Sequence, residues 1–306
     1  MLSIVIPAYN EGEVILNTAQ IIQNIMKESD IVYEIIFVDD GSCDNTWEYI
    51  EEIADKNTSI IGVKLSKNFG KESAMLAGLA HAKGDACAVI DCDLQHPPKL
   101  LVEMYQIWKI GGMDIVECVK QSRGKESAVY KHLANLFYIL IERMGGIDLK
   151  DSSDFQLLDR RVVDIIVNMP ERQRFFRALS SWIGFRRKQI PFCVEPRQGG
   201  TSKFNFYQSA KYALENITSF SSAPMQLVTF IGVSFSIAAA ILSIHTLYIW
   251  FVQGAVEGFT TVILLLLIIG SMLMISLGII GFYIGKIYEE IKCRPSYLIE
   301  RIVSKD

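Results

Sequence analysis

Two aspartates separated by one residue form the strongest chemical signal in this chain of 306 residues. Asp91, Cys92 and Asp93 follow the apolar run 87–90 and precede Leu94-Gln95-His96-Pro97-Pro98. Alternate residues point to opposite faces of a strand, but where a strand ends the backbone turns, and both carboxylates can then meet one hard cation. Mg²⁺ prefers a few carboxylate or carbonyl oxygens, with water and phosphate in its other positions. The pattern favours a metal site that neutralises a departing diphosphate over the alternative of a solvated turn.

Two other groups of polar residues also follow apolar runs directly. Tyr9 and Glu11 follow residues 3–6, and Asp40 follows residues 35–38. Tyr9 could stack on a nucleotide base, and the carboxylate of Glu11 or Asp40 could accept hydrogen bonds from its N–H groups. Ordinary turn and helix-cap chemistry is the alternative for each group.

The elements that must position these residues alternate between two kinds. Short runs rich in β-branched residues predict strands at 3–6, 35–38, 60–63 and 87–90, and stretches with helical spacing lie between them, such as Trp47, Ile50 and Ala54. Such alternation predicts an α/β fold, with a mostly parallel sheet covered by helices on both faces. Ligands bind at the carboxyl ends of such strands. We therefore expect the polar residues after three of these strands to line one cleft.

The C-terminal third has a different composition. Residues 225–256 and 258–285 contain no Asp, Glu, Lys or Arg, and each run exceeds the about 20 apolar residues that span a membrane. They predict a hairpin of two transmembrane helices within 224–285, more readily than buried core helices. Residues 204–223 have apolar residues at three- and four-residue steps, which fits either a juxtamembrane helix in the membrane interface or a helix packed on the domain.

Basic residues flank the hairpin and predict its orientation. Lys203 and Lys211 precede it, the tail 286–306 is basic, and the link between the helices contains no Lys or Arg. The positive-inside rule therefore places the N-terminal domain 1–203 and both termini in the cytosol, on a multi-pass protein of the plasma membrane. The net charge of −4 gives no reason to expect nucleic acid as a partner. The six cysteines lack metal-ligand spacing and are expected to be reduced thiols.

The order of the motifs resembles the family 2 glycosyltransferases of the GT-A fold. An Ile-Val-Ile-Pro-Ala-Tyr-Asn-Glu opening is followed by Val-Asp-Asp-Gly-Ser, Asn-Phe-Gly-Lys at 68–71 and the Asp-Cys-Asp-Leu-Gln-His-Pro-Pro run. Within that family the chain is similar to the polyisoprenyl-phosphate glycosyltransferases, which include dolichyl-phosphate mannose synthase and bactoprenol glucosyltransferase. The resemblance covers essentially the whole chain, including Arg197-Gln-Gly-Gly-Thr-Ser-Lys203 before the membrane portion.

The resemblance implies a role for individual residues. It implies nucleotide-sugar contacts from Pro7, Tyr9, Glu11, Val38, Asp40, Asp91, Cys92 and Gln95. It implies that Mg²⁺ or Mn²⁺ is held by Asp91, Asp93 and Gln95. Arg197 and Lys203 match positions that hold the phosphate of the polyprenyl acceptor, although both could be simple positive-inside residues. Lys120 and Lys131 are the nearest matches to two further basic positions, usually Arg, whose bidentate grip a lysine cannot reproduce.

The implied reaction is an inverting transfer of one sugar to a polyprenyl phosphate. The acceptor phosphate is already anionic, so the enzyme mainly aligns two phosphates and absorbs charge. Catalytic roles are assigned to Asp93 and Asp154; Asp154 could position acceptor or sugar, act as a base, or merely cap the helix expected at 162–169. UDP-glucose is the first donor to test, with UDP-N-acetylglucosamine, UDP-galactose and GDP-mannose left open, as is a homo-oligomer.

Two other classes of function compete with this reading. A processive polysaccharide synthase would carry a Gln-x-x-Arg-Trp motif and more membrane spans, whereas residues 173–177 read Gln-Arg-Phe-Phe-Arg with no following Trp. A scaffold that retains an inactive fold conflicts with the full set of polar residues at the strand ends.

Overall fold

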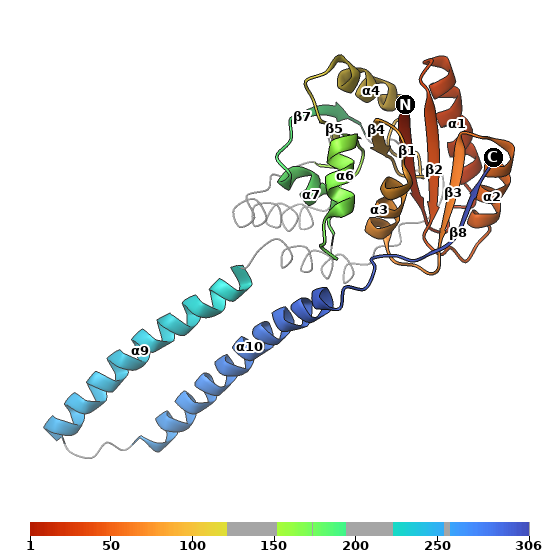
Figure 1. The fold of residues 1–306 in the computed structure, drawn as a ribbon. Helices are drawn as coiled ribbons and strands as arrows, with labels where there is room; N and C mark the ends of the chain where they lie inside the picture. The colour runs from red at the N-terminus through yellow and green to blue at the C-terminus, as the bar shows by residue number, and fades with distance from the viewer. Residues whose placement is uncertain (121–151, 173, 194–222, 254–257, 306) are drawn as a thin grey trace. The chain divides into compact units, whose positions relative to one another are not determined.

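The computed structural model describes residues 1–120, 152–172, 174–193, 223–253 and 258–305 (Figure 1). The chain divides into two compact units, Met1–Lys211 with Pro295–Asp306, and Tyr212–Arg294. Each unit is described by itself.

The first unit is built on one eight-stranded sheet, in the order β7-β5-β6-β4-β1-β2-β3-β8. Its strands are β1 (Leu2–Ala8), β2 (Tyr33–Asp39), β3 (Ile60–Leu65), β4 (Ala86–Val89), β5 (Ile115–Lys120), β6 (Gln156–Asp159), β7 (Arg187–Phe192) and β8 (Ile299–Ser304). Only β6 and β8 run antiparallel to their neighbours. All four strands expected from the sequence are present, and the α/β fold with a mostly parallel sheet is confirmed.

Alternation along the strands sends apolar side chains into two cores, one on each face. One core contains Ile4 and Ile6 of β1, and the other contains Val5. Helices α1 (Ile15–Glu28), α2 (Thr46–Lys56) and α4 (Leu100–Ile110) pack on the first, while α3 (Lys71–His81), α6 (Arg160–Asn168) and α7 (Phe176–Trp182) pack on the second. Both faces of the sheet are therefore covered, as the near-continuous apolar strands require.

The chain reverses its direction of travel across the sheet beside β1. From β1 it proceeds through β2 to β3 on one side, and it then returns to place β4 on the other side. In open α/β sheets ligands bind at the carboxyl ends of the strands beside such a switch point. The residues that follow β1, β2 and β4 are therefore the first place to look for a site.

The end of the chain differs from the basic tail expected at 286–306. Helix α10 continues to Ile291, and residues 299–304 form β8, which pairs with β3 and forms an edge of the sheet. Val303 packs against the first core, and Gly62 of β3 makes room for it, since a Cβ at Gly62 would lie 2.7 Å from Val303 Cγ2. The last residues are thus part of the first unit.

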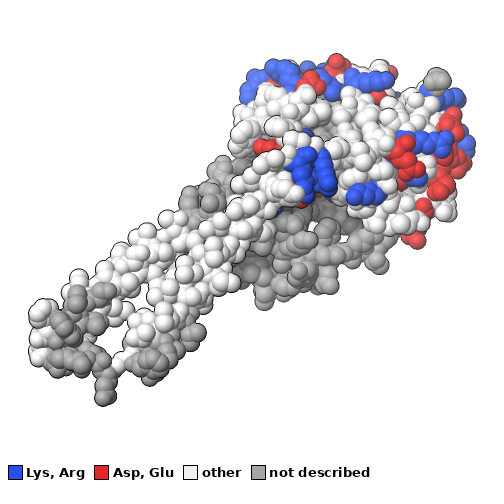
Figure 2. Space-filling model, turned by 60° about the horizontal axis from the view of Figure 1, so that its bottom comes forward, with Lys and Arg blue, Asp and Glu red and all other residues white. Residues whose placement is uncertain are grey.

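The second unit contains α9 (Ala223–Gln253) and α10 (Phe259–Ile291). Figure 2 shows the described part of both helices as an almost uncharged surface, with Lys and Arg concentrated elsewhere. Among the described residues one segment, Ile268–Ile291, is long and apolar enough to cross a membrane, and Val228–Leu242 is a shorter apolar helix. These two helices fall where the sequence predicts the hairpin; the juxtamembrane segment lies almost wholly outside the described residues.

Candidate active site

The loops that follow β1 and β2 are fastened to each other. The Asn10 amide donates to Ser42 Oγ at 2.9 Å, the Asn10 side-chain oxygen accepts from the Cys43 amide at 2.8 Å, and the Glu11 amide donates to Thr46 Oγ1 at 2.9 Å. Asn10 adopts a positive φ of 53°, a conformation that asparagine tolerates better than most residues. These bonds fix the backbone of Tyr9 and Glu11 beside the end of β2, where a nucleotide is expected.

Two consecutive aspartates stand at the end of β2, where Asp39 is the last strand residue and Asp40 follows it. Asp40 accepts hydrogen bonds from the amides of Phe69 and Gly70, at 2.7 and 2.9 Å, and burial raises the pKa of Asp40 to about 6. Asp39 accepts from the Ser42 amide with one oxygen, whereas its second oxygen is buried with no hydrogen-bond partner among the described residues. That buried oxygen makes Asp39 a candidate nucleotide contact, which the sequence analysis missed.

The loop after β4 presents the aspartate pair. The Thr18 hydroxyl of α1 donates to the Cys92 carbonyl at 2.7 Å, and the Gln95 amide donates to Asp93 Oδ1 at 3.1 Å. Leu94 between them has a positive φ of 57°. The backbone therefore turns sharply beside Asp93, and the convergence of Asp91 and Asp93 on one cation stays a prediction. Burial raises the pKa of the Cys92 thiol, so only its backbone is suited to ligand contact.

The pairing of β4 with β6 explains why Asp154 lies near Asp91. Val89 pairs with Gln156 in antiparallel register. Asp91 lies two residues beyond Val89 and Asp154 two residues before Gln156, so both reach the same edge of the sheet. Asp154 does not cap α6, because that helix is capped by Asp159, whose side chain accepts from the Arg161 amide.

Lys71 and Arg177 complete a cluster of charges at this edge. Lys71 Nζ lies 2.6 Å from Asp91 Oδ1 and 2.7 Å from Asp154 Oδ2. Arg177 grips Asp154 with two nitrogens, Nε on Oδ1 at 2.6 Å and Nη2 on Oδ2 at 2.9 Å. The Phe176 amide, at the start of the helix that carries Arg177, donates to Glu72 beside Lys71 at 2.9 Å. Two helices on the same face of the sheet are thereby joined at the site.

The two cations set the protonation of the carboxylates. Burial alone would raise the pKa of Asp154, but the Arg177 guanidinium and the Lys71 ammonium hold it well below its ordinary value. Burial likewise opposes ionisation of Asp91, and Lys71 with His96 reverses that effect and lowers its pKa. Glu72, one residue from Lys71, has its pKa raised to about 7 by burial and by the nearby charge of Asp154. Asp91 and Asp154 are therefore carboxylates at neutral pH.

Sequence reasoning did not assign roles to Lys71 or Arg177. Lys71 lies in the Asn-Phe-Gly-Lys motif, and Arg177 ends the Gln-Arg-Phe-Phe-Arg segment, whose spacing differs from the Gln-x-x-Arg-Trp motif. The available signal for Lys71 was its position at the start of a helix that follows a strand. Nothing local connects Arg177 with Asp154, because the two residues are 23 positions apart and belong to different parts of the fold, α7 and the segment before β6.

The other expected site residues divide into two groups. Pro7 and Val38 are buried strand residues at the carboxyl ends of β1 and β2, and Lys120 ends β5 at the same edge. Lys131, Arg197 and Lys203 lie outside the described residues.

The residues at this edge fit a metal that keeps much of its own coordination shell. Asp91 and Asp93 offer carboxylate oxygens, whereas the described residues contain no group of three or more His, Cys, Asp or Glu able to hold an ion by themselves. Mg²⁺ and Mn²⁺ sites that share a phosphate ligand need only such a pair. The Gln95 backbone amide donates to Asp93 Oδ1 at 3.1 Å, and metal binding by the Gln95 side chain stays a prediction.

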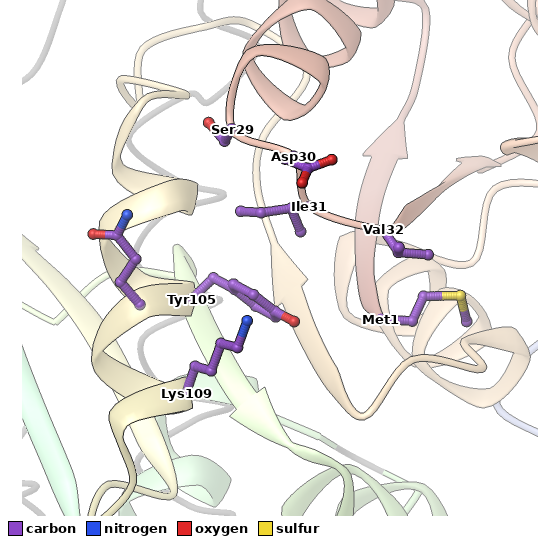
Figure 3. A pocket seen from close by; sticks show the side chains of 8 residues that line it. Met1, Ser29, Asp30, Ile31, Val32, Tyr105 and Lys109 are labelled. Atoms are coloured by element: carbon purple, nitrogen blue, oxygen red, sulfur yellow. The ribbon is translucent and has the colours of Figure 1, made fainter.

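One cavity among the described residues lies away from this site. It has a volume of about 270 Å³ and is lined by Met1 and residues 29–32, which precede β1 and β2, and by Tyr105, Gln106 and Lys109 of α4 (Figure 3). Met1 and Val32 stand at the amino ends of their strands. The cavity is therefore at the edge opposite the aspartates, and it brings none of the site residues together.

Known proteins similar to this chain are named glycosyltransferases. The sequence profile described as "Glycosyl transferase family 2" matches residues 3–165. An uncharacterized glycosyltransferase of Synechocystis is 39% identical over 97% of this chain and 94% of its own length. A prophage bactoprenol glucosyl transferase homolog of Escherichia coli is 33% identical over 98% of this chain and 99% of its own. The bactoprenol glucosyl transferase of Shigella phage SfII is also 33% identical, over 98% and 97%.

The chain belongs to glycosyl transferase family 2. It is a glycosyltransferase, and the strand-end cluster at the switch point is its candidate active site.

Proposed function

We propose that the chain transfers a single sugar, glucose in the first instance, from a UDP-sugar to undecaprenyl or another polyprenyl phosphate at the cytosolic face of the membrane. One observation carries the proposal: relatives named bactoprenol glucosyl transferase match nearly the full length of the chain, its apolar C-terminal helices included. A soluble acceptor would give no reason for a membrane segment attached to the catalytic unit.

Different residues of the site would contact the nucleotide, the metal and the lipid phosphate. Tyr9, Glu11 and Asp40 would contact the nucleotide, and the buried oxygen of Asp39 offers another acceptor. Asp91 and Asp93 would hold Mg²⁺ or Mn²⁺, which when bound neutralises the departing diphosphate. Arg197 and Lys203 remain the proposed contacts to the lipid phosphate, with Lys120 and Lys131 as further phosphate contacts.

A strong general base is not needed. The acceptor phosphate is already anionic, so alignment opposite the departing diphosphate and stabilisation of charge suffice for an inverting transfer. Asp154 would position reacting groups, because a carboxylate whose two oxygens are held by cations is a weak proton acceptor.

The experiment is transfer of radiolabel from a panel of nucleotide sugars to undecaprenyl phosphate by the full-length protein in detergent or liposomes. The proposal expects Mg²⁺- or Mn²⁺-dependent label in the organic phase, with mass spectrometry showing one hexose per lipid. Label that remains in the aqueous phase as polymer would support a processive synthase instead. No transfer from any donor of the panel would contradict the proposal.

A further inference from the structure

One cation occupies the carboxylate that the metal would use. Lys71 Nζ lies 2.6 Å from Asp91 Oδ1 and 2.7 Å from Asp154 Oδ2. The Lys71 side chain is 42% exposed, whereas that of Asp154 is 7% exposed. The stem of Lys71 is therefore partly open to solvent, whereas Asp154 is nearly enclosed.

An ammonium and a divalent cation compete on one carboxylate. Two positive charges about 4 Å apart repel each other, and the repulsion grows as water is excluded from between them. A metal that binds Asp91 would therefore weaken the contact of Lys71 with Asp91. The nearest new anion would be the diphosphate that shares the metal.

We propose that Lys71 is a positioning residue that exchanges partners, holding Asp91 in the absence of metal and moving to the donor diphosphate when the metal takes Asp91. This inference rests on the proposed function and adds to it the step by which the donor site is assembled.

The surroundings of Lys71 permit the exchange. Lysine carries a compact charge on a flexible four-carbon stem, whereas the planar guanidinium of Arg177 is a fixed fork. Arg177 contacts both oxygens of Asp154, at 2.6 and 2.9 Å. When Lys71 leaves, the nearly buried Asp154 therefore keeps an ionic partner. Asp91, whose side chain is 27% exposed, gains the metal.

The first test measures Mn²⁺ binding by electron paramagnetic resonance on the full chain, with Lys71→Met and a control, Lys67→Met. Lys67 lies on the connection from β3 to α3, shortly before Lys71, is exposed and contacts the Phe69 ring rather than a carboxylate. Both variants lose one positive charge, so a general electrostatic effect is common to them. Since a charge-assisted contact contributes a factor of about ten or more, Lys71→Met should bind Mn²⁺ about tenfold more tightly than Lys67→Met. In the presence of Mn²⁺ it should bind UDP about tenfold more weakly.

The opposite changes in Mn²⁺ and UDP affinity distinguish an exchange of partners from a purely structural role of Lys71. If Lys71 only stabilised the structure of the site, its loss would weaken both Mn²⁺ and UDP binding. Mn²⁺ binding by Lys71→Met that is equal to or weaker than that of Lys67→Met overturns the inference.

A second measurement uses the unmodified protein and does not depend on the folding of a variant. Acetic anhydride labelling, read by mass spectrometry, should modify Lys71 slowly in metal-free protein because the ammonium is ion-paired. Labelling should rise several-fold with saturating Mn²⁺ and fall again when UDP is added, while labelling of Lys67 in the same sample stays constant. Lys71 labelling that ignores bound Mn²⁺ contradicts the exchange alone. Failure of the protein to bind Mn²⁺ with or without UDP contradicts the metal site of the proposed function as well.

Discussion

Asp154 makes contact with Arg177 through both carboxylate oxygens and with Lys71 through one. These contacts lower its pKa well below the ordinary value, although burial acts in the opposite direction. The contacts that make Asp154 a poor base also fix its orientation, because a bidentate pair holds the plane of the carboxylate. At the residue scale, Arg177 is therefore a positioning residue for Asp154.

We expect Arg177→Ala to lower kcat by about ten- to a hundredfold, the value of a charge-assisted contact, with a smaller change in KM for the donor. Arg177→Lys should recover part of the rate, since lysine restores the charge but not the fork. Steady-state kinetics with each substrate varied in turn provides the measurement.

The chain offers a matched control for that substitution. Arg186 also contacts both oxygens of one aspartate, Asp114, at 3.1 and 3.4 Å. Asp114 precedes β5 and lies at the amino edge of the sheet, away from the candidate site. Arg186→Ala should keep nearly the full rate, and an equal loss in both variants would mean that Arg177 acts only through stability.

The second residue-scale prediction concerns pH and Asp40. Its pKa is raised to about 6 by burial, so the carboxylate that would accept from the base is lost as the pH falls below 6. UDP affinity should therefore drop up to about tenfold for each pH unit below 6, and Asp40→Asn should bind weakly with little pH dependence. Binding is a better readout than rate, because Glu72, with a pKa of about 7, titrates nearby.

Protonation of Asp40 does not unfold the protein, so unfolding caused by Asp40 would not explain a loss of UDP affinity at acid pH. Because its pKa is higher in the folded chain than in the unfolded one, the folded chain binds more protons between about pH 4 and 6. The contribution of Asp40 to stability therefore falls as the pH rises through this window and is largest below it. UDP affinity that is constant from pH 7 to 5 would remove Asp40 from the nucleotide contacts.

At the element scale, the sequence predicts the strands that end in the polar site residues, but it does not predict which distant strands pair with the sheet. β1, β2 and β4 are local apolar runs that end in polar residues, so the positions of Tyr9, Asp40 and Asp91 follow from the sequence. The approach of Asp154 depends on the antiparallel register of β6 against β4, a pairing between distant segments. Strand β8 escaped prediction for the same reason: its burial exists only through its pairing with β3.

The strand β8 supplies an element-scale prediction. Val303→Asp should destabilise the protein by about 1–3 kcal/mol, because it places a charge against the core. Ile302 lies on the other side of the strand and is 48% exposed, so Ile302→Asp should cost much less. Thermal unfolding of the full chain in detergent measures both. Equal and small effects would show that β8 does not stabilise the sheet in solution.

At the scale of the whole molecule, use of a cytosolic sugar donor requires both ends of the hairpin on the cytosolic side. We expect Gly258→Cys, at the N-cap of α10, to react with a membrane-impermeant maleimide in intact cells. The exposed Cys293, beyond the other end of that helix, should react only after permeabilisation. The unsubstituted protein, with its native cysteines, is the control. Labelling of Cys293 from outside would show that the orientation is the reverse of the one predicted, in which case the domain could not use cytosolic UDP-sugars.

The central claim is that the aspartates after β4 carry out sugar transfer to the lipid, and Asp93→Ala tests it most directly. The measurement is the rate at which label from UDP-glucose, or whichever donor the panel identifies, enters extractable undecaprenyl phosphate with Mg²⁺ or Mn²⁺ present. Unfolding temperatures confirm that the variant is folded. Loss of one such electrostatic contact is typically worth 10²–10³ in rate, so the account predicts a fall of at least about a hundredfold. A folded Asp93→Ala variant that retains more than about a tenth of the wild-type rate would contradict it.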